Sequence, residues 1–271
     1  MSLGIVVKAP EGLVLAAESR ITLSAQPPKG AGIYVNFDNA TKLLSFGEKH
    51  NFVGIVTYGQ AAIGLRTPHS FIPEFESQLP KERISVECFA QHFSEFFMQQ
   101  WQAQMPADYK GPNMTFVIGG FDEGEPYGRV FQIDIPSNPA PIEPNPGNQF
   151  GITWGGQREF VDRLIQGYDH RLPDIMSRTL NLDASQVQAM RQALTPLQMQ
   201  VPLMGMPLQD CVNLAIFFIR TTIMAQRLTV GIRGCGGPID VAIITRRDGF
   251  KYIQRKEIMG EAEQIIGTSQ A

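Results

Sequence analysis

The order of strand-like and helix-like segments along the chain predicts an α+β protein. Short apolar runs rich in β-branched residues occupy the first and last parts of the sequence, and apolar residues recur at three- and four-residue spacing in between. Strands, a helix, strands, helices and strands follow one another, which differs from the strict strand–helix alternation of a parallel sheet. Because no internal repeat or low-complexity linker divides the sequence, we predict a single domain over residues 1–271.

Composition and charge narrow the possible functions. The 271 residues are 43% hydrophobic and 18% charged, the composition of a soluble globular protein with a sizeable core. A formal net charge of −3 gives no electrostatic reason to expect a nucleic-acid or membrane partner. No charged segment precedes an apolar run at the N-terminus, and the apolar stretch 211–219 is too short to span a bilayer. We therefore expect a cytoplasmic protein.

The cysteines and histidines do not have the spacing of a metal site. The three cysteines are far apart and form no C-x-x-C pair, and the four histidines are scattered. We predict no metal and no cofactor, and a reducing compartment in which Cys88 and Cys211 pack as small hydrophobic residues.

The first third of the chain is predicted to be mostly strand. Apolar runs at 3–8 and 13–17 are separated by Ala-Pro-Glu-Gly, which is typical of a hairpin turn. Residues 23–38 contain two prolines, glycines and asparagines and are expected to form a loop. Two further strands are expected at 42–46 and 52–58.

A helix is predicted from Ser85 to Trp101. Its apolar residues recur on one face, and Ser85 suits the N-cap position. That face consists of Val86, Phe89, Phe93, Phe96, Phe97 and Trp101. We interpret this aromatic stripe as core packing.

The same patterns assign the rest of the chain. The expected strands are 114–121, 129–135, 150–154, 240–245 and one that begins at Phe250. The expected helices are 159–168, 183–197 and 207–226, the last with Pro207 at its first position. Residues 136–148 are rich in proline and are expected to form an exposed connection.

The first two residues offer a possible nucleophile. Methionine followed by serine is a good substrate for methionine removal, which would leave Ser2 with a free α-amine. Such an amine titrates near pH 7.7–8.0 in model peptides, so one residue would carry both a nucleophile and a general base. Many proteins begin with Met-Ser for no catalytic reason, so this signal is weak by itself.

The residues that follow strengthen it. The opening segment is SLGIVVKAPEGLVLAAESRIT. It resembles, without a gap, the start of proteasome β-subunits and their bacterial relatives, especially the ancestral-β-subunit family known as Anbu. The resemblance places Ser2 at the catalytic N-terminal threonine, and Gly12 at the hairpin glycine. The extra N-terminal segment of the family's α-subunits is not expected here, because only Met1 precedes Ser2.

Later blocks extend the resemblance over most of the chain. NATKLLSF is similar to the strand with the family's catalytic lysine, and VTYGQAAIG to the turn whose glycine amide holds the oxyanion. MTFVIGGFDEG and RVFQIDI are similar to the second sheet, and GGPIDVAIITRRDGF to the final hairpin. The resemblance implies a four-layer αββα sandwich of the N-terminal-nucleophile (Ntn) hydrolases, with two antiparallel sheets between helical layers.

The resemblance implies a role for each of four residues. Ser2 would attack a peptide or amide carbonyl, and Lys42 would lower the proton affinity of its hydroxyl and amine. Glu18 would pair with Lys42 and fix its position, and the Gly59 N–H would stabilise the oxyanion. The simpler alternative is a partly buried ion pair between neighbouring strands and a glycine required by a tight turn.

Further positions are implied for substrate binding. Thr22 is a plausible contact to the substrate backbone, and Arg20 is expected to be structural. The specificity pocket would be lined by Ile21, Ala40, Thr57 and Ala61. Such a lining suggests small to medium apolar substrate side chains.

The sequence also departs from the family pattern. Serine replaces threonine at the nucleophile, and glutamate replaces aspartate at residue 18. Ile232 and Cys235 fall at the family's supporting aspartate and serine, and Trp154-Gly155-Gly156 lies where a catalytic serine is usual. Cys235 could supply a weak thiol hydrogen bond or could simply pack.

Two insertions are predicted, near 23–38 and 171–204. The second is amphipathic and methionine-rich, which fits either a subunit contact or a helical hairpin that caps its own domain. We expect a ring or helical homo-oligomer, and no motif identifies an ATPase partner. Three functions fit: a proteasome-like peptidase using Ser2, a catalytically silent scaffold subunit, and an amidase acting on small amides.

Overall fold

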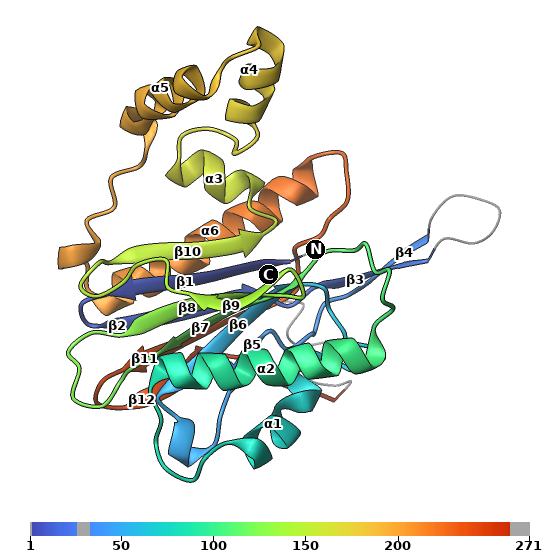
Figure 1. The fold of residues 1–271 in the computed structure, drawn as a ribbon, viewed down its shortest axis with the longest axis vertical. Coiled ribbons are helices and arrows are strands. Elements are labelled where there is room, and N and C mark those ends of the chain that lie inside the picture. Colours follow the sequence, from blue (N-terminus) through green and yellow to red (C-terminus); the bar gives the residue numbers. More distant parts are fainter. Residues whose placement is uncertain (1, 26–32, 261–271) are drawn as a thin grey trace.

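Two antiparallel sheets and their helices make up most of the protein (Figure 1). The computed structural model describes residues 2–25 and 33–260. The first sheet has the strand order β10–β1–β2–β11–β12, and its strands are β1 (Leu3–Ala9), β2 (Gly12–Glu18), β10 (Gly151–Gly156), β11 (Ile239–Thr245) and β12 (Gly249–Gln254). The second has the order β5–β6–β7–β8–β9, and its strands are β5 (Leu43–Ser45), β6 (Val53–Gly59), β7 (Met114–Gly120), β8 (Arg129–Ile135) and β9 (Asn138–Ile142).

Helices and short 3₁₀ turns connect the strands along the chain. The α-helices are α1 (Ile72–Gln78), α2 (Val86–Gln104), α3 (Glu159–Ile165), α4 (Leu172–Leu180), α5 (Ala184–Leu194) and α6 (Leu208–Leu228). Short 3₁₀ turns are η1 (Glu48–His50), η2 (Pro68–Phe71), η3 (Thr195–Leu197) and η4 (Leu203–Gly205). The mixed architecture of helices and antiparallel sheets predicted from the sequence is confirmed.

Strand β1 shows how one segment serves two cores. Leu3, Ile5 and Val7 belong to a cluster that includes residues of α6, whereas Val6 belongs to a cluster shared with the second sheet. Side chains alternate between the two faces of a strand, so β1 is buried on both sides and reads as a continuous apolar run. This burial fixes the N-terminal strand, and with it the position of Ser2.

Helix α6 covers the other face of the first sheet. Its residues Ala215, Phe218 and Ile219 are fully buried in the cluster that contains β1, β2 and β11. The helix has 21 residues and so extends well beyond the apolar stretch noted in the sequence. By length and composition it could cross a membrane, and among the described residues it is the one such helix.

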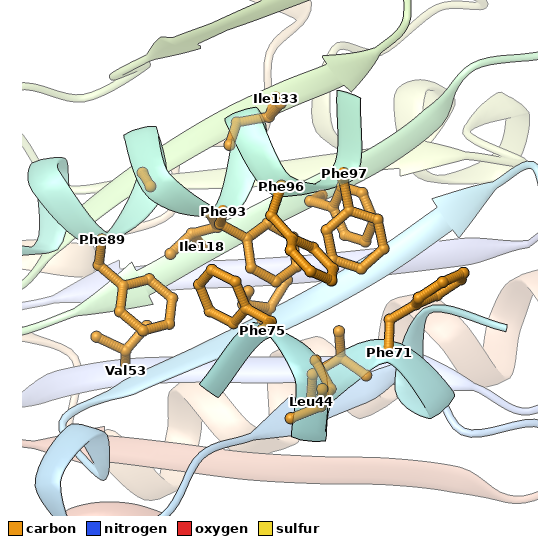
Figure 2. Close-up of a cluster of buried hydrophobic side chains, with 14 of the residues drawn as sticks. Leu44, Val53, Phe71, Phe75, Phe89, Phe93, Phe96, Phe97, Ile118 and Ile133 are labelled. Atoms are coloured by element: carbon orange, nitrogen blue, oxygen red, sulfur yellow. The ribbon is translucent and has the colours of Figure 1, made fainter. Parts of the chain in front are cut away.

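An aromatic cluster packs α1 and α2 against the second sheet (Figure 2). Ser85 caps α2 by accepting a hydrogen bond from the Cys88 N–H, as predicted. Phe93 lies at the centre: its ring centroid is 5.0 Å from that of Phe75 and 4.9 Å from that of Phe116, both in edge-on geometry. The predicted stripe is therefore core packing.

Residues 23–38 are not a simple loop. The structure instead forms a ribbon of β3 (Ile21–Ala25) and β4 (Ile33–Phe37), which projects from the body of the protein (Figure 1). Residues 26–32 of this predicted insertion lie outside the described residues. In the sequence, the prolines and glycines lie between the two strands and favour a loop. This loop pattern outweighed the strand preference of the β-branched and aromatic residues on either side.

Three further differences from the predictions concern residues 136–148, Cys88 and two short helices. The predicted connection 136–148 contains β9, an edge strand that tolerates prolines because one side of its backbone needs no partner. Cys88 is exposed on α2, so its predicted burial is wrong, whereas Cys211 is buried. Helices α1 and α4 were not expected, because each is short and begins beside a proline that resembles loop punctuation.

The segment 171–204 forms a helical excursion. Helices α4 and α5 pack on each other and extend away from the two sheets (Figure 1). A full capping box, in which Asp183 and Gln186 exchange hydrogen bonds, starts α5. No residue of α5 is buried, so this helix adds little to the core.

We predict that replacing Phe93 with alanine will lower the free energy of unfolding by about 3–5 kcal/mol. The substitution removes several edge-on aromatic contacts and leaves a cavity in the core. Urea unfolding followed by circular dichroism measures this. Leu65→Ala is the control, since Leu65 is fully exposed and its loss should change stability by no more than about 0.5 kcal/mol. Equal effects of the two substitutions would contradict the assigned core.

Candidate functional site

Ser2 lies at the start of β1, and only 4% of it is exposed. Its carbonyl oxygen accepts a hydrogen bond of 2.6 Å from the Gln157 N–H, just beyond β10. The pairing of Leu3 with Gly156 continues this contact along the two strands. The backbone of the candidate nucleophile is therefore held by strand pairing.

Glu18 is the most highly connected side chain near Ser2. It ends β2, is fully buried, and accepts hydrogen bonds from the N–H groups of Leu3 (3.1 Å), Arg20 (2.8 Å) and Gly236 (3.0 Å). Its Oε1 also pairs with the Lys42 ammonium. A buried carboxylate needs such compensation, and here three separate segments of chain and one side chain provide it.

Lys42 precedes β5 and reaches between the sheets. Its Nζ donates to Glu18 Oε1 and, at 2.5 Å, to the Arg20 carbonyl oxygen. An ammonium has three N–H donors, so within the described chain one donor remains for a group in the adjoining recess. Burial lowers the pKa of Lys42 from its ordinary value, and the neighbouring carboxylate of Glu18 opposes this shift.

A small recess lies beside Lys42. It is lined by seven of the predicted site residues, namely Ser2, Ile21, Ala40, Lys42, Thr57, Gly59 and Ala61. It is also lined by Thr41, Tyr58, Gln60, Thr67 and Pro68, none of which we predicted as site residues. The lining comes from the start of β1, from β3, and from both ends of the β5–β6 hairpin.

Two residues of β6 shape the recess, one through its backbone conformation and one through its hydroxyl. Gly59 has φ of +90°, and a Cβ there would lie 2.1 Å from the Asn113 carbonyl oxygen, so only glycine fits. Thr57 is 5% exposed, and its Oγ1 is buried without a hydrogen-bond partner in the described part of the chain. A buried hydroxyl of this kind is costly unless a ligand or water satisfies it.

Arg20 holds the neighbouring loops in place. It makes a two-pronged contact with Asp38, with N–O distances of 2.6 and 2.7 Å, and donates to the Arg233 carbonyl oxygen at 3.2 Å. The guanidinium lowers the pKa of Asp38 through this contact. A Cβ on Gly236 would lie 2.4 Å from the Arg20 guanidinium carbon, so a larger residue there would displace the Arg20 side chain from this position. This geometry fits the structural role expected for Arg20.

Other sequence-predicted positions lie outside the recess. Thr22 is on β3, where its Oγ1 donates to Asn36 Oδ1 at 2.8 Å, and it is not among the lining residues. Ile232 is 49% exposed. Cys235 is buried in the core beneath α6, and burial raises the pKa of its thiol so that it stays neutral.

Tyr58 is the largest of the lining residues that the sequence did not predict. A Cβ on Gly155 would lie 2.2 Å from the Tyr58 hydroxyl oxygen, so no serine fits at that position while this ring is in place. The available signal was Gly4, a glycine inside an otherwise β-branched strand, which indicates close approach of another group.

Within the described residues, no cluster of three or more His, Cys, Asp or Glu could hold a metal ion.

Comparison with known proteins yields matches only among solved structures. No protein-family model matches the sequence, and no curated protein does. The Gly-1 mutant of Anbu from Hyphomicrobium sp. strain MC1 aligns with a TM-score of 0.57 and 18% identity, over 99% of this chain and 92% of that one. The chain shares the Anbu fold.

Two further structures agree. The Anbu helical assembly from Pseudomonas aeruginosa aligns with a TM-score of 0.57 and 14% identity, over 98% of this chain and 92% of that one. Anbu, the ancestral β-subunit, from Yersinia bercovieri aligns with a TM-score of 0.56 and 16% identity, over 99% and 97%. The low identities make this a similarity of fold to proteasome-like proteins.

We predict strong coupling between Glu18 and Lys42. Glu18→Gln alone should lower the free energy of unfolding by about 3–5 kcal/mol, because it leaves a buried cation without its partner. Adding Lys42→Met should recover part of that loss, as measured by urea unfolding in a double-mutant cycle. Glu159→Gln, in the exposed pair with Arg163, is the control and should cost less than about 1 kcal/mol. Additive losses would show that the pair is not coupled.

Thr57→Val should raise the free energy of unfolding by about 1 kcal/mol in the absence of ligand, because it removes a buried hydroxyl without a partner. The matched control is Thr115→Val on the neighbouring strand, whose Oγ1 donates to Asp134 at 2.5 Å. That substitution should lower stability by about 1–2 kcal/mol. Thermal or urea unfolding of both variants distinguishes them, and destabilisation by Thr57→Val would mean that its hydroxyl is satisfied.

Proposed function

We propose that this chain is a proteasome-like Ntn hydrolase in which Ser2 becomes the nucleophile after removal of Met1. One observation carries the proposal: Ser2 and the Glu18-paired Lys42 line the same recess. The Anbu-like fold supports it, because it brings the start of β1 to the end of the β5–β6 hairpin.

The proposed reaction uses groups of this recess. The Ser2 Oγ attacks the amide carbon while its proton passes to the free α-amine, and the carbonyl oxygen takes up the negative charge. The Gly59 N–H stabilises that oxyanion, and Lys42, as a cation, favours the alkoxide-like form of Ser2. The amine then gives its proton to the departing nitrogen. Water next adds to the acyl carbon and gives one proton to the amine. The bond between that carbon and Oγ then breaks, the amine returns the proton to Oγ, and the carboxylic acid product leaves.

The recess favours small substrates. Ile21, Ala40 and Ala61 supply an apolar lining, and Thr57 supplies one free hydroxyl. We infer that a small to medium side chain enters here, with the substrate either a peptide or a small amide. Thr22 would contact a longer peptide along β3, beyond the recess.

The four-layer αββα arrangement belongs to the same proposal. Its support is the presence of three separate apolar clusters: one between the sheets, one beneath α6, and one beneath α1 and α2. Homo-oligomer formation is also proposed. The exposed apolar residues of the α4–α5 excursion, including Ile175 and Leu180, support it, and the Pseudomonas relative is a helical assembly.

A scaffold function is the competing proposal. Half-exposed Ile232 and the neutral Cys235 supply no charge near Ser2 where the resembling family has an aspartate and a serine. On that view the recess has no catalytic role, and the subunit contributes only to assembly.

We predict that a β-lactone or epoxyketone probe will add once to the natively expressed protein, at Ser2, after loss of Met1. Intact mass and peptide mapping measure both events. Ser2→Ala should abolish the adduct, and Lys42→Met should slow its formation at least a hundredfold, because the cation that lowers the proton affinity of Ser2 is lost.

Ser185→Ala is the control, since Ser185 is an exposed serine on α5 and does not line the recess. It should leave labelling unchanged. A retained Met1, or a free Ser2 that forms no adduct, would reject the hydrolase and favour the scaffold function.

A further inference from the structure

Two loops hold the backbone of Ser2 and the carboxylate of Glu18. The first follows β10, where the Gln157 N–H donates to the Ser2 carbonyl oxygen at 2.6 Å. The second precedes β11, where the Gly236 N–H donates to Glu18 Oε2 at 3.0 Å. These loops are far apart in the sequence, so any link between them is made by the tertiary fold.

Gln226, near the end of α6, links the two loops. Its Oε1 accepts a hydrogen bond of 2.9 Å from the Cys235 N–H, and its Nε2 donates one of 3.3 Å to Gln157 Oε1. The side chain lies inside the protein, and the residue is 7% exposed. Because a backbone N–H can only donate, the Gln226 oxygen has to face Cys235, which leaves its NH₂ group for Gln157.

These contacts complete a closed path around the candidate nucleophile. The path runs from the Ser2 carbonyl oxygen through Gln157 to Gln226. The loop 235–236 continues it to the Glu18 carboxylate. That carboxylate also accepts a hydrogen bond from the peptide N–H that follows Ser2, so the path returns to β1. Gln226 is the member that joins its two halves.

The loop before β11 depends on this contact. Cys235 is 2% exposed, and a buried backbone N–H is costly unless it has a partner, which Gln226 provides. Glycines occupy positions 234, 236 and 237, so this stretch has few side chains of its own to pack. One hydrogen bond from α6 therefore restrains the backbone that orients Glu18.

We propose, on the basis of the function proposed above, that Gln226 is a positioning residue for the reaction at Ser2. It does not touch the reacting atoms. It keeps the backbone of the nucleophile in register with the loop that orients Glu18, and through Glu18 with the Lys42 ammonium. Reacting groups need accurate placement, and a misplacement of about 1 Å can cost a hundredfold in rate.

The test is Gln226→Met, which keeps a side chain of similar length and volume and removes both hydrogen bonds. The maximal rate of β-lactone adduct formation at Ser2 should fall about tenfold, the net contribution of one to two neutral hydrogen bonds. The probe concentration at half-maximal rate should stay unchanged, because Gln226 does not line the recess. A merely structural role would lower the melting temperature without changing the maximal rate.

The matched control is Thr222→Val, one turn earlier on the same helix. Thr222 is fully buried, and its Oγ1 donates to the Phe218 carbonyl oxygen at 2.9 Å within α6. This substitution also removes a buried side-chain hydrogen bond, but it should leave the labelling rate unchanged. Equal slowing by the two substitutions would assign the effect to a general loosening of α6 and overturn the positioning role.

The failure of this proposal differs from the failure of the hydrolase. If the unaltered protein forms no Ser2 adduct, the proposed hydrolase itself fails. If it forms the adduct and folded Gln226→Met reacts at the same rate, the positioning role is overturned while the hydrolase stands.

Gln157→Met supplies a second, milder test. It keeps the backbone N–H that binds Ser2 and removes only the bond to Gln226, so it is informative even if Gln226→Met does not fold. It should slow labelling roughly threefold, since one hydrogen bond is lost instead of two. The double variant should be no slower than Gln226→Met, because both substitutions break the same link. An unchanged rate in Gln157→Met, or losses that multiply in the double variant, would reject the link.

Discussion

The buried carboxylate of Glu18 is the constraint on which the site depends. It accepts hydrogen bonds from backbone N–H groups of Leu3, Arg20 and Gly236, and it pairs with the Lys42 ammonium. These groups come from the start of β1, the end of β2, the loop before β11 and the segment before β5. A carboxylate without exposure to water is costly to bury unless such contacts compensate it, so the folding that buries Glu18 also assembles the surroundings of Ser2.

Close approach of backbone and side chain shapes the rest of the recess. Gly59 takes a φ of +90° beside the Asn113 carbonyl, and the glycines at 4 and 155 leave room for the ring of Tyr58. Larger side chains at these points would push the two sheets apart or displace the tyrosine. The absence of side chains at Gly4 and Gly155 on one sheet is thus what allows the Tyr58 ring of the other sheet to lie against β1 and β10.

The periphery of the protein differs in kind from this rigid centre. The β3–β4 ribbon carries exposed apolar residues such as Tyr34 and Phe37, and the α4–α5 excursion carries Ile175 and Leu180 (Figure 1). A two-stranded ribbon alone is marginally stable in water, and apolar side chains on both features remain unburied within one copy. In the proposed function the centre would carry the chemistry at Ser2, and the exposed apolar residues of the α4–α5 excursion would contact other copies of the chain.

The sequence by itself predicted the types of most core elements and named seven of the residues that line the recess. Two-residue and three-to-four-residue periodicities do not depend on distant contacts, so β1, β2 and α2 were predictable. The resemblance of local motifs to a known family pointed to Lys42 and Gly59, which both line the recess. The sequence did not determine β3, β4 and β9, because pairing with a neighbouring strand outweighed the prolines and glycines nearby. The tertiary structure alone decided the partners of buried polar groups. Tyr58 meets Gly4 and Gly155, and Glu18 meets Gly236, only after residues far apart in the chain are packed together, and no local pattern encodes such a distance.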